Sequence, residues 1–163
     1  MRALRILALS LSSALWSLPA AGQTVTEFGI TGDAASSSRF ARANAFEITQ
    51  PSRLEELQLY LDSDDGVVTL AVWRRTEPSG TTYSQWWTQD VAVGPSGSAW
   101  YAAQPDLELE DGYFYAIGFW SEQDCGYTWA EGLAAANPVW GEHLGSIASE
   151  STDDVPVAVY GPE

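Results

Sequence analysis

The 163-residue chain has no lysine, one cysteine and one histidine. A disulfide needs two cysteines, so Cys125 has no partner with which to form one within the chain. Zinc and copper sites use several His and Cys ligands, so His143 and Cys125 alone argue against a transition-metal site. A Ser-His-Asp triad would have to use His143, and no Gly-x-Ser-x-Gly motif accompanies it. We therefore predict a protein that is not an enzyme.

Basic charge is also scarce. Seven arginines stand against 22 acidic residues, and the formal net charge is −15. Such a surface repels phosphates and anionic lipids, which argues against nucleic acid and membrane surfaces as partners. The acidic residues are scattered along the chain, which favours a role in solubility over a dedicated cation site.

The N-terminus has the order of a secretory signal peptide. Arg2 and Arg5 are followed by an apolar run over residues 4–16, and Pro19 then precedes the small residues of 20–22. The run is too short to span a bilayer, and no second long apolar stretch follows. We predict that residues 1–22 are a signal peptide, that the protein is secreted or periplasmic, and that residues 23–163 form a single domain without membrane insertion.

The remaining sequence alternates like β-strands. β-Branched, aromatic and other apolar side chains recur with period two, on one face of an extended chain, over residues 57–61, 67–73, 113–120 and 155–159. Segments rich in Gly, Asp, Pro and Ser separate these runs at residues 62–66, 77–80, 94–97 and 110–112. This spacing predicts an all-β fold, a single antiparallel β-sandwich of jelly-roll-like form. We expect a loop or a flexible entry to the fold at residues 32–38, a surface or loop position for His143, and a weak helix at 131–136.

Several phrases in this order resemble a known module. They are LQLYLD at 57–62, VTLAVW at 68–73, GSAWY at 97–101, LEDGYFYAIG at 109–118 and NPVWG at 137–141. Together they resemble a jelly-roll-like β-sandwich accessory module of secreted bacterial proteins, over most of residues 40–160. The resemblance implies the fold and carries no catalytic or binding residue. This chain departs from the module in being more acidic, free of lysine and richer in tryptophan.

Tryptophan is abundant. Seven lie after the predicted signal peptide: Trp73, Trp86, Trp87, Trp100, Trp120, Trp129 and Trp140. Adjacent residues of a strand point to opposite faces, so Trp86-Trp87 and Trp100-Tyr101 should each place one ring outward unless a bulge intervenes. Exposed indoles stack on sugar rings and anchor interfaces. We predict that Trp86, Trp87, Trp100 and Tyr101 bind a carbohydrate or another component of the cell surface.

Other interpretations stay open. Asp62, Asp64 and Asp65 place three carboxylates in one turn, and calcium is the cofactor that such a turn would suit, although no glutamate closes the loop. The tryptophans could instead anchor self-association of a structural surface or matrix protein, in which Cys125 is either a buried thiol or an intermolecular cross-link. A hydrolase that uses a pair of carboxyl groups is the third hypothesis.

Overall fold

The computed structural model describes residues 3–5, 24–25, 34–63, 66–77, 79–94, 98–129, 138–149 and 155–161. Every regular element in these ranges is a β-strand, which confirms the predicted all-β class. The described ranges contain no helix of the length and apolarity needed to cross a membrane. The weak helix expected at 131–136 lies outside the described residues.

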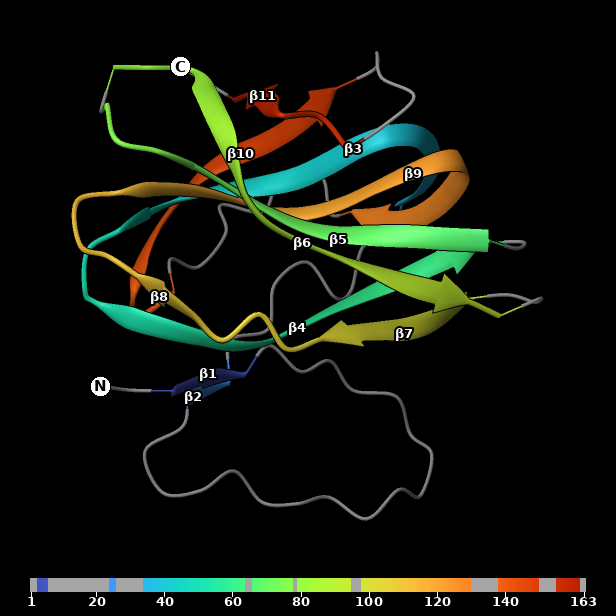
Figure 1. The fold of residues 1–163 in the computed structure, drawn as a ribbon, viewed down its shortest axis with the longest axis horizontal. Coiled ribbons are helices and arrows are strands. Elements are labelled where there is room, and N and C mark those ends of the chain that lie inside the picture. The colour runs from blue at the N-terminus through green and yellow to red at the C-terminus, as the bar shows by residue number, and fades with distance from the viewer. Residues whose placement is uncertain are drawn as a thin grey trace.

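Eleven strands follow one another along the described chain (Figure 1). They are β1 (Ala3–Arg5), β2 (Thr24–Val25), β3 (Ala34–Ile48), β4 (Ser52–Ser63), β5 (Gly66–Arg75), β6 (Thr82–Val93), β7 (Ser98–Ala103), β8 (Leu107–Leu109), β9 (Phe114–Trp129), β10 (Gly141–Ser149) and β11 (Ala158–Tyr160). The turn predicted at 110–112 falls between β8 and β9, whereas those predicted at 62–66, 77–80 and 94–97 are described only in part. All strand pairs are antiparallel except those of β1 with β2 and β4.

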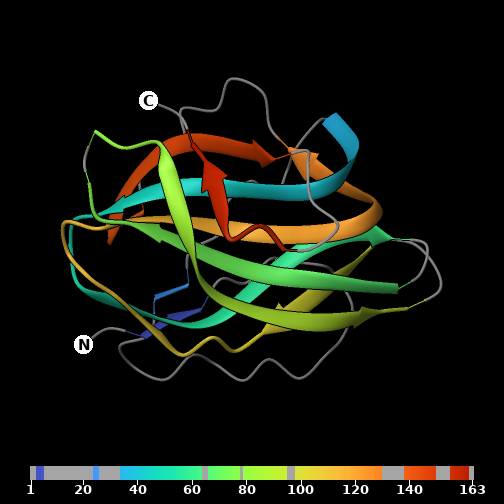
Figure 2. The ribbon, with the colours of Figure 1, turned by 45° about the horizontal axis from the view of Figure 1, so that its top comes forward.

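The strands form two layers that share β9. One layer has the order β6-β5-β9-β3-β10, and β4 with β7 and β8 forms the other. The first half of β9 pairs with β5 over residues 114–121, whereas its second half pairs with β4 over 125–127. A β-bulge in the β3–β9 pair, where Phe40 has a φ of 73°, coincides with this change of partner. Bulges bend strands, and Figures 1 and 2 show β3 and β9 curving together.

An inner core fills the space between the layers. Val68, Leu70 and Val72 of β5 lie on one face, as the alternation predicted, and pack with Leu57 and Leu61 of β4. The buried members of this core also include Phe46, Ile48, Leu54, Val93, Tyr101, Ala103, Leu109, Tyr115, Ile117, Phe119, Cys125 and Trp140. The inner core is the apolar interior expected of a β-sandwich.

An outer core covers the opposite face of β5 and β9. Its floor is a row of alanines on β3, β5 and β9, and its large side chains include Trp73, Tyr83, Phe114 and Trp120. The segment of residues 155–161 crosses this face: β11 pairs with β6, and the indole Nε1 of Trp73 donates a hydrogen bond to the carbonyl of Pro156 at 2.8 Å. The central strands are therefore buried on both faces.

Two local expectations were wrong. Residues 34–38 belong to β3 and not to a loop, because their backbone pairs with the second half of β9. His143, expected at the surface or in a loop, is half-buried in β10, which pairs with β3. Of the run at 155–159, only residues 158–159 enter a strand, and Val157 is exposed while Val159 is fully buried.

Candidate functional site

The four aromatic residues predicted to bind a ligand differ in exposure. Trp86 is 50% exposed, Trp87 packs partly buried against the inner core, Trp100 is half-buried and Tyr101 is a buried core residue. Trp86 and Trp87 lie on β6, whereas Trp100 and Tyr101 lie on β7. Tyr101 therefore offers little surface to a ligand in this conformation.

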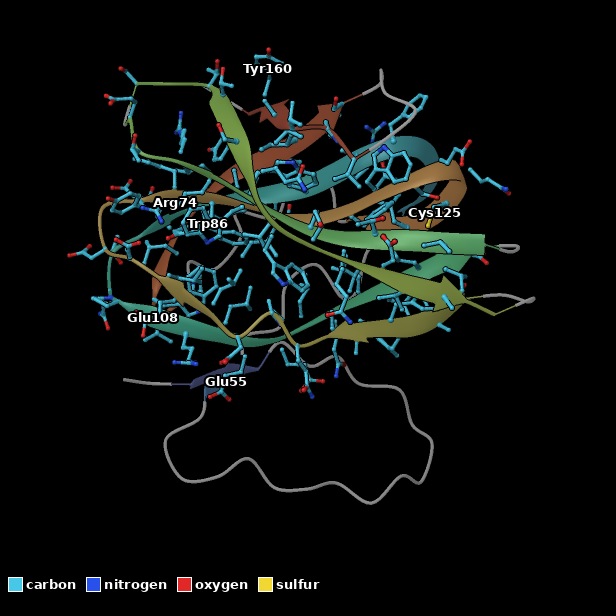
Figure 3. The ribbon with its side chains drawn as sticks, in the orientation of Figure 1. Glu55, Arg74, Trp86, Glu108, Cys125 and Tyr160 are labelled. Carbon is cyan, nitrogen blue, oxygen red and sulfur yellow. The ribbon has the colours of Figure 1, made fainter. Side chains whose placement is uncertain are left out.

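A β-bulge decides how Trp86 lies. Val72 pairs with Trp87 and Trp73 pairs with Gln85, so Trp86 is an extra residue with no partner on β5. The bulge interrupts the alternation, and both indoles lie on the inner-core side of β6: Trp87 against the core itself, and Trp86 against Arg74 at its margin. Figure 3 shows Arg74 and Trp86 beside each other.

Arg74 is the centre of an aromatic cluster. Its guanidinium carbon lies 4.4 Å from the ring centroid of Trp86 and 3.8 Å from that of Tyr113, with Tyr115 at 5.9 Å. Its Nη1 lies 2.9 Å from a carboxylate oxygen of Glu110. We call these five residues the Arg74 cluster. The side chain of Arg74 is only 13% exposed to solvent, whereas Trp86 is 50% exposed.

The turn between β8 and β9 holds the cluster in place. Gly112, at a φ of 75°, donates its N–H to the carbonyl of Ile48 at 2.9 Å, and Ile48 donates back to the carbonyl of Tyr113. The N–H of Glu110 donates to the hydroxyl oxygen of Tyr115 at 3.1 Å. Burial raises the pKa of Tyr115, so this phenol stays neutral at physiological pH. Glu110 and Tyr113 are thereby fixed on either side of Arg74.

These contacts hold the side chain of Trp86 in one orientation in the protein without ligand. Cation–π contacts contribute about 0.5–2 kcal/mol each, more where they are desolvated as Arg74 is. A side chain already held in one rotamer loses less conformational entropy on binding. The cluster can therefore offer a rigid aromatic surface, flanked by the hydrogen-bonding groups of Glu110 and Tyr113.

A second aromatic pair lies on the other layer. Tyr60 of β4 pairs directly with Trp100 of β7, and their ring centroids lie 4.9 Å apart. Tyr60 is exposed, on the face opposite Leu59 and Leu61. Sequence analysis missed Tyr60, although the alternation at 57–61 placed it on the outward face. The pair offers a second, smaller aromatic surface that is separate from the Arg74 cluster.

The predicted calcium turn is described only in part. Asp62 is exposed at the end of β4, and Asp64 and Asp65 lie outside the described residues. Within the described ranges, no group of three or more His, Cys, Asp or Glu side chains is placed to hold a metal ion. Calcium binding at residues 62–65 stays a prediction.

His143 packs on β10 beside Phe46, with ring centroids 5.4 Å apart, and its Nε2 lies 3.4 Å from Oδ1 of Asn44. Burial lowers the pKa of His143, which favours the neutral imidazole. Several described carboxylates contact other side chains: Glu110 contacts Arg74, Asp106 contacts Arg53, and Asp90 accepts from Thr69. The carboxyl-pair hydrolase stays a hypothesis.

Cys125 lies in the inner core and is fully buried. Burial, with a smaller contribution from the nearby charge of Asp62, raises the pKa of its thiol to about 12. Because the thiolate is the reactive form, we expect the native protein to resist a disulfide-exchange reagent at pH 8 and to react at once when unfolded in urea. Absorbance of the released thiol measures both rates, and rapid labelling without denaturant would contradict this burial.

No family model, curated protein or solved structure matches the chain.

Proposed function

We propose that this protein is a secreted, non-catalytic binding module that recognises a carbohydrate of its surroundings through Trp86 of the Arg74 cluster. The half-exposed indole of Trp86, held on Arg74, is the observation that carries the proposal. The signal-peptide pattern supports export, and the sequence resemblance supports a role like that of accessory modules in secreted bacterial proteins.

Carbohydrate suits this surface better than the other partner classes do. The C–H faces of a pyranose ring are apolar and stack on indole, while its hydroxyls need donors and acceptors at the rim. Glu110 and Tyr113, which contact Arg74 as Trp86 does, would supply such groups. The net charge of −15 disfavours polyanions such as nucleic acid.

We expect Trp86→Ala to weaken binding to a recognised polysaccharide at least tenfold, because loss of one stacked aromatic costs about 1.4 kcal/mol or more. A glycan array with the chain lacking residues 1–22 identifies the ligand. Fluorescence titration of the wild type and the variant then measures the change in Kd.

Tyr160→Ala is the matched control, because Tyr160 is an aromatic residue of β11 that is 65% exposed. Trp100→Ala tests the pair with Tyr60. Binding that survives Trp86→Ala and fails with Trp100→Ala would move the site to the Tyr60–Trp100 pair. A wild type that binds no glycan on the array would refute the proposal.

Self-association is the second candidate. Val157 and Tyr160 of the C-terminal segment are 79% and 65% exposed, and apolar side chains of this size are often covered in an interface. Sedimentation velocity over a range of concentrations tests this alternative: a monomer throughout would exclude it.

A further inference from the structure

Arg74 and Arg75 are neighbours on β5 and enter different environments. Strand alternation turns Arg74 to the inner side and Arg75 to the outer core. Arg75 is the more deeply buried, at 8% exposure, and lies between two rings: its guanidinium carbon is 4.4 Å from the ring centroid of Phe114 and 4.8 Å from that of Tyr83.

Arg75 differs from its neighbour in its charge partner. Arg53 and Arg74 each have a carboxylate within ion-pair distance, whereas no carboxylate of the described ranges lies that close to Arg75. Its Nε and the hydroxyl of Tyr83 are both buried and lack hydrogen-bond partners among the described protein groups. The guanidinium of Arg75 and the ring of Tyr83 thus lie in contact in the outer core, where Nε of the one and the hydroxyl of the other have no acceptor among the described residues.

An unpaired buried charge is costly. Desolvation of an ion costs several kcal/mol, and the cation–π contacts of Arg75 with Phe114 and Tyr83 offset only part of that free energy. A phenol buried without an acceptor adds its own cost, and burial raises the pKa of Tyr83, which keeps this phenol a donor. The arrangement is stabilised once an anion approaches, because guanidinium N–H groups match carboxylate oxygens in a planar, bidentate geometry.

We propose that Arg75 and Tyr83 form a binding site for the carboxylate group of a small, singly charged organic acid. A single arginine can neutralise only one negative charge. Glu47 and Arg75 pair with Phe114 from the two sides of β9 and so share its face, and Glu142 pairs with Glu47. These carboxylates repel the dianionic form of phosphate more strongly than a monoanion.

The site is separate from Trp86, and it stands or falls independently of the proposed carbohydrate binding. The test uses thermal unfolding of the wild type at pH 7 and constant ionic strength, with chloride replaced stepwise by acetate. We expect a saturable rise of the midpoint by about 3 °C or more, because a ligand that binds only the folded state stabilises it. Phosphate at the same ionic strength should give a smaller rise.

Arg75→Gln should abolish the acetate effect and Tyr83→Phe should weaken it. Arg53→Gln, which changes an arginine on the surface of β4, should leave it intact. Should Arg75→Gln fail to fold, the Nε–H resonances of ¹⁵N-arginine-labelled wild type supply the readout, since one of them should shift on adding acetate. Equal thermal unfolding curves in chloride and acetate, with no shift of an arginine Nε–H resonance, would show that these groups bind only water. That result would overturn the proposed site. A larger, saturable effect of phosphate that Arg75→Gln abolishes would overturn the carboxylate assignment, whereas a rise shared by both proteins reflects only the general stabilisation by phosphate.

Discussion

Gly118→Ala is expected to destabilise the protein by at least about 3 kcal/mol, enough to leave much of the chain unfolded if its total stability is near the low end of the usual range. Gly118 lies in the middle of β9, paired with Ala43 of β3 and Ala71 of β5. A Cβ at this position would lie 1.9 Å from the carbonyl oxygen of Arg42 and 2.5 Å from the Cα of Ala43. Both are backbone atoms, so relief requires β3 to move away from β9.

Urea unfolding followed by tryptophan fluorescence measures this loss. Gly94→Ala is the matched control, because a Cβ at Gly94 would meet no atom within 4 Å, and its stability should stay within about 0.5 kcal/mol of the wild type. Equal stabilities of the two variants would show that β3 and β9 do not approach as closely as described.

Deletion of residues 155–163 is expected to lower the free energy of unfolding by about 2.5–6 kcal/mol. Val159 is fully buried in the outer core, which corresponds to about 1.5–3 kcal/mol of apolar burial. The indole of Trp73 loses its bond to the Pro156 carbonyl, and a donor left buried without an acceptor costs about 1–3 kcal/mol more. The ring of Tyr83, against which Gly161 packs, also loses cover.

Two point variants distinguish the loss of buried apolar surface from the effect of shortening the chain. Val159→Ala should lower the free energy of unfolding by about 2 kcal/mol, whereas Val157→Ala, at a position 79% exposed, should change it by less than about 0.5 kcal/mol. Acrylamide quenching of the deleted protein should rise as Trp73 becomes accessible. A deletion with unchanged stability would mean that the outer core does not depend on this segment.

The fold class could be predicted from the sequence because period-two alternation and turn residues are local signals. The face of Val68, Leu70 and Val72 was assigned from residues within a single strand. The burial of Trp73 on the opposite face could not be assigned in that way, because it depends on Pro156 and Val159, more than 80 positions along the chain. The start of β3 was missed for a related reason: its serines and alanines form a strand only when β9 lies beside them.

The candidate site was predictable in part. The chain composition indicated exposed tryptophans, and Trp86 is one of them. The turn at Gly112 was predicted from its composition, but the role of Arg74 also depends on the bulge between Val72 and Trp73, which leaves no periodic signal in the sequence. Tyr101 was grouped with Trp100 by adjacency, yet the same alternation that exposes one neighbour buries the other.

β9 runs from one layer into the other, so one continuous strand belongs to both layers. Its first half is hydrogen-bonded to β5 and its second half to β4, with β3 alongside both. Separation of β4 from β9 would also displace the strand that pairs with β5. A force applied to one layer therefore acts on the other. We therefore expect the two layers to unfold together, in a single cooperative transition.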